Sequence, residues 1–269
     1  MPELPDVEVY RRYLDATALH SPVTGVEVPS PAVLRGTTPQ GLGRALKGRP
    51  FEATRRHGKY LFVRLGNGDG NGDGDRYLVL HFGMTGELAY AGDGGPPPEY
   101  TACRFCFDDG GSLAYVAPRK LGRVSVTGSL SGFIEEHELG PDALSLSKEQ
   151  FRRLAEGRRG SVKSFLMNQE VMAGIGNVYS DEILFQAGIH PRRAVSDLDP
   201  ADLDALRRAM RKVLRQAIAA GAEPQEMPES FLLPRREEDG LCPRCGGRLR
   251  RITVSGRTAW LCPDCQPLS

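Results

Sequence analysis

The sequence lacks several features that would assign the protein to a class at once. No apolar run in its 269 residues approaches the ~20 residues that a membrane-spanning helix needs. The first residues carry neither the basic nor the apolar segment of a secretory leader. Charge of one sign is also missing, because 35 basic residues face 34 acidic ones and leave a formal net charge of +1. We therefore expect a soluble cytoplasmic protein in which any nucleic-acid surface depends on local clustering of cations.

Cysteine is scarce, and its spacing argues against disulfides. The chain has six cysteines, and without a leader a reducing compartment and metal ligation are expected. Two CxxC pairs separated by sixteen residues fit a tetrahedral site of four thiolates for one structural zinc ion. A redox role would explain only one such pair. The expected zinc ligands are Cys242, Cys245, Cys262 and Cys265. Cys103 and Cys106 lie on an expected strand, where side chains three apart point to opposite faces, so we expect ordinary thiols there.

Hydrophobic periodicity divides the chain into an N-terminal helix, a β-rich part and a helical part. Apolar spacing predicts a helix over residues 3–20. Short β-branched segments with turns between them predict an antiparallel sandwich or barrel; they are 23–28, 59–65, 77–82, 101–107, 113–116 and 123–127. Helical patterns follow over 147–156, 161–168, 178–187 and 200–220. Residues 66–75, rich in Gly and Asp, fail a calcium-loop signature at its closing position and are interpreted as a flexible hairpin insertion.

The opening residues offer amine chemistry. Removal of Met1 would leave Pro2 as a secondary amine directly before the carboxylate of Glu3. An α-amino group titrates near pH ~8, whereas a lysine titrates near ~10.4, so more of it is nucleophilic at physiological pH. Such an amine can attack a masked carbonyl carbon and form an iminium. The alternative is an ordinary terminus without a function.

Three further stretches are compatible with nucleic-acid binding, and each has a plainer alternative. The turn at Gly174-Ile-Gly-Asn177 offers backbone amides for an anion at the start of a helix, or is simply a helix–helix turn. Met84, in a loop between glycines, suits a wedge in a base stack, or fills a gap in the core. The arginines of the four-cysteine segment suit a phosphate clamp, or form a solvated face; they are Arg244, Arg248, Arg250, Arg251 and Arg257.

Four stretches in this order closely resemble the formamidopyrimidine-DNA glycosylase / endonuclease VIII family across essentially the whole chain. They are Met1–Glu8 (MPELPDVE), His81–Gly86 (HFGMTG), Gly174–Tyr179 (GIGNVY) and the four-cysteine C-terminus. The resemblance implies an α+β multidomain fold with an N-terminal β-sandwich or barrel, a helix-two-turn-helix domain and a zinc-finger hairpin. We expect these domains at residues 1–132, 133–222 and 223–269. It also implies a monomeric, prokaryotic-type, nucleoid-associated enzyme that needs no small-molecule cofactor.

By the same resemblance the protein is a bifunctional DNA glycosylase and abasic-site lyase of base excision repair. A damaged nucleotide of double-stranded DNA would flip into a cleft between the β-rich and helical domains. The resemblance implies catalytic roles for Pro2, which would form the Schiff base, and for Glu3, Lys59 and Arg257. It implies DNA contacts by Met84, Arg119, Leu121, Arg158, Asn177 and Arg257.

Departures from the family pattern leave specificity open. Leu121 stands where phenylalanine is usual, and it stacks less well on bases. Residues 221–242 are shorter than in 8-oxoguanine-specific members, so the lesion can be an oxidised purine, an oxidised pyrimidine or a bulkier base. Preference for duplex, bubble or single-stranded DNA is equally open. Two other functions remain, a damaged-DNA-binding protein without glycosylase activity and a zinc-ribbon interaction protein.

Overall fold

A computed structural model describes residues 1–67, 75–92 and 94–268 of the chain. The Gly- and Asp-rich insertion falls largely on residues 68–74 and so lies outside the described residues. The chain forms two compact units, the first from residues 1–2 and 6–137 and the second from residues 3–5 and 138–269. The start of helix α1 (Leu4–Thr17) thus belongs to the second unit, and the rest of the helix belongs to the first.

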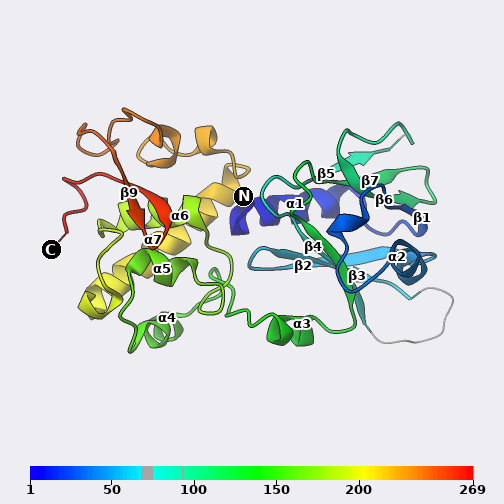
Figure 1. Cartoon of the computed structure of the whole chain (residues 1–269), viewed down its shortest axis with the longest axis horizontal. Helices are drawn as coiled ribbons and strands as arrows, with labels where there is room; N and C mark the ends of the chain where they lie inside the picture. The colour runs from blue at the N-terminus through cyan, green and yellow to red at the C-terminus, as the bar shows by residue number, and fades with distance from the viewer. Residues whose placement is uncertain (68–74, 93, 269) are drawn as a thin grey trace. The chain divides into compact units, whose positions relative to one another are not determined.

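The described part of the first unit contains two four-stranded antiparallel sheets (Figure 1). One sheet has the order β1-β6-β7-β5, from β1 (Val23–Glu27), β5 (Glu87–Ala91), β6 (Thr101–Phe107) and β7 (Ser112–Val116). The other has the order β2-β3-β4-β8, from β2 (Phe51–His57), β3 (Tyr60–Leu65), β4 (Arg76–His81) and β8 (Arg123–Thr127). Alternate residues of both sheets, such as Leu61, Leu80 and Phe105, meet in one apolar core together with Val7 and Leu14 of α1.

Three short elements complete this unit. A 3₁₀ turn spans Pro31–Val33, α2 spans Pro39–Leu46, and α3 spans Leu130–Glu136. Thr38 and Ser129 cap the two helices by accepting hydrogen bonds from backbone amides three residues on. Helix α3 packs Phe133 against Phe62 and Val79 on the second sheet.

The second unit is built from helices around a core of its own. These are α4 (Lys148–Ala155), α5 (Val162–Met167), α6 (Asn177–Ala187) and α7 (Pro200–Ala219), with 3₁₀ turns at Val195–Asp197, Pro224–Glu226 and Leu233–Arg235. Capping boxes at Ser147 and Asp199 begin α4 and α7, the two helices that the patterns over 147–156 and 200–220 predict. Leu4 is fully buried in this core, which ties the start of α1 to it.

The unit ends in an antiparallel hairpin, β9 (Arg250–Val254) and β10 (Arg257–Leu261). Trp260 and Leu249 of this region pack on Phe185 of α6 and on Leu232. The predicted fold class is confirmed, with an N-terminal helix, antiparallel sheets, a helical part and a C-terminal hairpin. Sequence periodicity missed α2, β2, β5 and α3. No helix among the described residues is long and apolar enough to cross a membrane.

Candidate functional site

The carboxylate of Glu3 caps the N-terminus of α6. Its Oε2 accepts hydrogen bonds from the amides of Gly176 at 2.6 Å and Tyr179 at 3.3 Å, and its Oε1 accepts one from Val178 at 2.8 Å. The helix has no capping side chain of its own, because its N-cap residue is Gly176. Glu3 is only 1% exposed and therefore fixes the backbone directly after Pro2. A side chain 173 residues away in sequence supplies the anion that this helix terminus attracts.

This contact changes the interpretation of the Gly-Ile-Gly-Asn turn. The sequence predicts an anion site at its amides, and the amides of Gly176 and Val178 indeed bind an anion, but it is Glu3 of the same chain. A Cβ atom on Gly176 would overlap the Glu3 carboxyl group, and one on Gly174, where φ is +121°, would overlap Leu4. Both glycines are required because α1 begins in contact with this turn.

Asn177 is the first residue of α6 and lies in the same turn as the Glu3 contact. Its side-chain Oδ1 is buried and has no hydrogen-bond partner within the part of the chain that the structure describes. Its backbone carbonyl accepts a hydrogen bond from Lys163 Nζ at 3.3 Å. Glu3 and Asn177, two of the residues singled out in the sequence, therefore meet at one helix terminus.

A buried charged network supports this terminus, and the sequence analysis did not anticipate it. Lys163 Nζ lies 2.5 Å from Asp181 Oδ1 and 2.8 Å from Ser180 Oγ, while Arg236 contacts the other oxygen of Asp181 at 2.9 Å. Burial lowers the pKa of Lys163 and raises that of Asp181, and their mutual attraction opposes both shifts. The sequence does contain a signal for this network. A lysine stands within the apolar run of α5, and two adjacent acidic residues stand within the apolar run of α6.

Glu182, the next residue of α6, holds the segment that follows α7. Its Oε2 accepts a hydrogen bond from the amide of Leu233 at 2.8 Å, and its Oε1 accepts one from Gln186 Nε2 at 2.9 Å. Burial raises the pKa of Glu182 to about 7. The segment before the zinc finger is thus anchored on α6 through Glu182, Asp181 and Gln186.

Lys59 and His81 lie close together in the first unit. Lys59 is in the two-residue turn that joins β2 to β3, just before the strand on which its sequence pattern places it, and it is 8% exposed. His81 ends β4, and its Nδ1 accepts a hydrogen bond from the amide of Gly83 at 3.3 Å. Burial, Arg123 and Lys59 together lower the pKa of His81 to about 4, so its ring is neutral at pH 7. His81 belongs to the HFGMTG stretch, but the sequence analysis gave it no role.

The loops of Met84 and Leu121 touch through their backbones. A Cβ atom on Gly83, where φ is +61°, would lie 2.6 Å from the backbone of Leu121 and Gly122. The hydroxyl of Tyr115 donates to the carbonyl oxygen of His81 at 2.9 Å, and it also lies next to Gly122 in the second loop. Met84 is 41% exposed and Leu121 is 50% exposed, although both are large and apolar.

Arg119 is exposed beside them in the second loop. The first unit therefore presents two exposed apolar side chains on loops that touch, with an exposed cation in the second of these loops. The exposure of Met84 excludes the alternative that this side chain fills a gap in the core.

Arg257 lies at the tip of the C-terminal hairpin. Ser255 and Gly256 form its turn with φ of 46° and 75°, which is the backbone of a tight type I′ turn, and Val254 pairs with Arg257 across it. The tip is attached to α5, because Ser164 Oγ donates a hydrogen bond to Ser255 Oγ at 2.8 Å. The Arg257 side chain itself is exposed.

The four cysteines form a compact cluster whose geometry fits zinc. Their sulfur atoms all lie within 4.8 Å of one another, with 3.9 Å between Cys242 and Cys265 and 3.5 Å between Cys245 and Cys262. Tetrahedral Zn–S bonds of ~2.3 Å imply S···S distances of about 3.8 Å. Burial and the neighbouring thiols raise the pKa of Cys265 to about 12, so four thiolates here need a cation between them. The donor set fits one structural zinc ion and leaves no position for a substrate.

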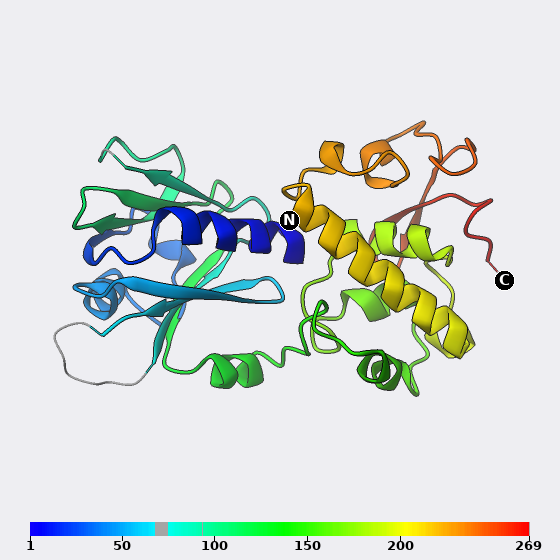
Figure 2. The same cartoon turned by 180° about the vertical axis from the view of Figure 1, so that it is seen from behind.

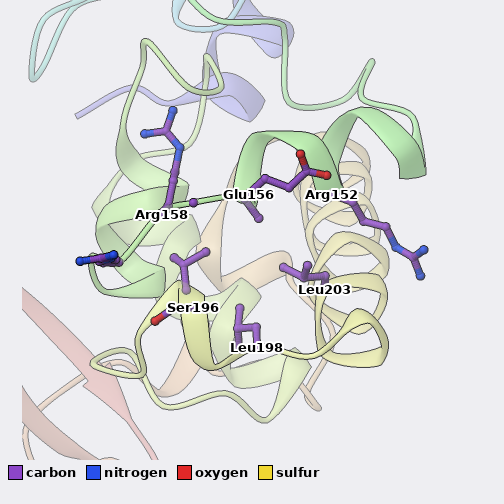
Figure 3. A pocket seen from close by; sticks show the side chains of 10 residues that line it. Arg152, Glu156, Arg158, Ser196, Leu198 and Leu203 are labelled. Carbon is purple, nitrogen blue, oxygen red and sulfur yellow. The ribbon is translucent and has the colours of Figure 1, made fainter.

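Arg158 lies in the turn after α4. Its Nε donates to the carbonyl oxygen of Leu154 at 2.8 Å, and the residue borders a hollow of about 390 Å³. Figure 3 shows the guanidinium groups of Arg158 and Arg152 pointing in different directions rather than converging. The hollow therefore does not surround a single anion.

Family models match nearly the whole chain in three consecutive parts. Residues 1–124 match the formamidopyrimidine-DNA glycosylase N-terminal domain, and residues 139–228 match the formamidopyrimidine-DNA glycosylase H2TH domain. Residues 241–268 match a zinc finger found in FPG and IleRS.

Relatives and solved structures agree with these models over the full length. A formamidopyrimidine-DNA glycosylase of Symbiobacterium thermophilum is 34% identical, covering 100% of this chain and 90% of the relative. The Alkalilimnicola ehrlichii protein of the same name is 35% identical, covering 99% and 100%.

A structure of Lactococcus lactis Fpg with DNA containing an abasic site has a TM-score of 0.86 at 26% identity, covering 99% of this chain and 100% of that one. The same values hold for a complex of that protein with DNA containing FAPY-dG.

Proposed function

Because the chain belongs to the formamidopyrimidine-DNA glycosylase family, we propose that it is a bifunctional DNA glycosylase and abasic-site lyase of base excision repair. Its partner is damaged double-stranded DNA, from which it removes a damaged base before it cleaves the strand. The observation that carries the proposal is the anchored carboxylate of Glu3 beside Pro2. An amine can act as a nucleophile at one defined sugar atom only if the backbone that carries it is held in place.

Pro2 is the nucleophile. After removal of Met1, the secondary amine attacks the sugar carbon C1′, the bond from C1′ to the damaged base breaks, and the base leaves with a proton. Opening of the sugar ring produces an iminium between Pro2 and C1′. A secondary amine gives an iminium without an N–H proton to lose, so its positive charge persists and acidifies the proton on C2′. Loss of that proton expels the 3′ phosphate, and a second elimination expels the 5′ phosphate.

Glu3 positions Pro2 and serves the proton transfer at the sugar oxygen. The three backbone amides of α6 bind both oxygens of the carboxyl group and hold it next to Pro2. The amides fix the orientation of the carboxyl group, which is what general acid–base catalysis requires of its geometry.

DNA is held by cations and by apolar side chains. Lys59, Arg257, Arg158 and Asn177 bind phosphates, and Arg257 also assists the second elimination. Met84, Arg119 and Leu121 enter the duplex where the damaged nucleotide has left the stack. The exposure of Met84 and Leu121 on loops that touch supports this role, because an apolar wedge must project from the protein surface to separate bases.

The zinc ion is structural and fixes the hairpin that carries Arg257. We further propose the division into domains at residues 1–132, 133–222 and 223–269, a monomeric state, and action in the cytoplasm on nucleoid DNA. The relatives named above are bacterial, which supports that location.

Borohydride trapping tests the proposal. Purified protein with Met1 removed is incubated with duplexes that carry an abasic site, ring-opened guanine, 8-oxoguanine or an oxidised pyrimidine. Reduction of the iminium to a stable covalent adduct is expected on the abasic duplex, and the other duplexes identify the class of base removed. No adduct on any duplex would contradict the proposal and would favour a protein that binds damage without cutting.

A further inference from the structure

The solvent face of α7 carries a continuous row of cations. Arg208, Lys212 and Arg215 are exposed and Arg211 is half-buried, at spacings of three and four residues along one side of the helix. We call these four residues the α7 basic stripe. Figure 2 shows α7, in yellow and gold, at the surface of the second unit with one side open to solvent. From Ala205 to Ala222 the sequence contains no acidic residue, although the whole chain is nearly neutral.

No member of the stripe forms an ion pair with any residue that the structure describes. Arg211 donates to the carbonyl oxygen of Leu144 at 2.8 Å, and Lys212 lies 5.5 Å from the ring centre of Phe231. Like charges three or four residues apart destabilise a helix, and the stripe contains such pairs along its whole length. Burial, Arg215 and Arg207 lower the pKa of Arg211, as expected for cations that repel one another. A bound polyanion would remove this repulsion.

The composition of this face argues against a protein or membrane partner. Protein interfaces are anchored by buried aromatic and aliphatic side chains, but no large apolar residue of α7 is exposed. Insertion into a membrane surface needs an apolar face, and that of α7 is buried in the core of the second unit through Leu206, Val213 and Leu214. A row of cations without an apolar anchor is instead suited to a regular array of phosphates.

We propose that the α7 basic stripe is a second DNA-binding surface that contacts the phosphate backbone of an undamaged duplex without reading its sequence. The stripe spans eight residues, and the seven rises between them give about 10.5 Å along the helix axis. One strand of duplex DNA presents a phosphate about every 3.4 Å of axis, so the stripe covers about three intervals and matches about four consecutive phosphates. Three of the four cations are arginines, whose planar forks match phosphate oxygens. The inference rests on the proposed function, because that function makes DNA the polyanion that the protein meets.

Two matched triple variants test it in the full-length, zinc-loaded protein. The stripe variant carries Arg208→Gln, Lys212→Gln and Arg215→Gln. The control variant carries Arg44→Gln, Lys47→Gln and Arg153→Gln, three exposed cations elsewhere that give the same change of charge. Glutamine is nearly as good a helix former as arginine or lysine, and circular dichroism verifies that both variants fold. Each protein is first saturated with a short duplex carrying an abasic analogue, and a labelled undamaged duplex is then titrated by fluorescence anisotropy.

We expect the saturated wild-type protein and the control variant to bind the second duplex. With four phosphate contacts, the affinity should fall about 150-fold between about 50 and 200 mM salt, from a slope of about −3.6 in log–log form. The stripe variant should bind the second duplex much more weakly. Because one cation of the stripe remains, the slope of log affinity against log salt concentration should fall to about −0.9. The inference would be overturned if both variants bound the second duplex equally well, or if the wild-type protein did not bind it. It would also be overturned if the wild-type protein bound polyglutamate as tightly as the second duplex. Binding of the first duplex and borohydride trapping report on the proposed function separately, and both variants should retain them.

Discussion

Replacing Glu3 by glutamine separates the helix cap from the chemistry. The substitution keeps the size of the side chain but turns one carboxylate oxygen into an NH₂ group. Glu3 Oε2 accepts two hydrogen bonds and Oε1 accepts one, so the new amide oxygen will occupy the first position and its NH₂ group will face the amide of Val178. Two donors then oppose each other at a site that is 1% exposed.

The cost follows from the three hydrogen bonds. A buried donor that loses its partner destabilises a protein by about 1–3 kcal/mol, and a bond to a charged acceptor contributes about 1 kcal/mol more than a neutral one. With one amide left unpaired and two bonds weakened, Glu3→Gln should lower the free energy of unfolding by about 3–5 kcal/mol. The control Glu149→Gln changes an exposed carboxylate and should leave the free energy of unfolding nearly unchanged.

Urea unfolding followed by tryptophan fluorescence measures the effect. Trp260 is the single tryptophan of the chain and packs on Phe185 of α6 in an apolar cluster of the same unit as Glu3, so its emission reports on the unfolding of that unit. Borohydride trapping at low temperature, where the variant stays folded, measures the chemistry in parallel. An unchanged unfolding free energy together with lost trapping would refute the capping argument and leave Glu3 a purely chemical role.

Three further predictions follow from the same structure. Pro2→Gly should abolish most trapping and strand cleavage but leave DNA affinity within about threefold, because it changes the amine and not the phosphate contacts; unchanged cleavage would remove Pro2 from the mechanism. Cys262→Ser should lose zinc and DNA affinity together, measured by metal analysis and anisotropy, and a zinc-loaded, DNA-competent variant would contradict the four-thiolate site.

The third concerns Glu182, whose pKa of about 7 in the folded protein exceeds the ordinary 4.5. The folded state therefore binds more protons between these values, and stability should decrease as the pH rises from about 4.5 to 7. Glu182→Gln should flatten that profile, because a glutamine side chain does not titrate in this range. A profile unchanged by the substitution would exclude this group as its source.

The sequence by itself determined the features that depend on local patterns. The spacing of Cys242, Cys245, Cys262 and Cys265 indicated the cluster, because two CxxC turns each bring two sulfurs together without help from the rest of the fold. The helical patterns over 147–156 and 200–220 predicted α4 and α7, because their apolar spacing is local to each segment. The core strands were visible through their β-branched alternation. Strands β2 and β5 were not, because β2 carries the charged residues Glu52, Arg55 and Arg56 and β5 contains no β-branched residue. Helix α2 was hidden by Gly41 and Gly43, which weaken its helical pattern.

Only the tertiary structure decided how the candidate site is supported. Glu3 and the amides of α6 are more than 170 residues apart in sequence, and no local pattern records that they meet. The contact of Lys163 with Asp181 likewise depends on how α5 packs against α6. His81 is neutral because the fold buries it beside two cations, although its sequence context only marks the end of a strand. Sequence patterns act over a few residues, whereas the electrostatic environment of a buried group is set by chain segments that folding brings together from far apart.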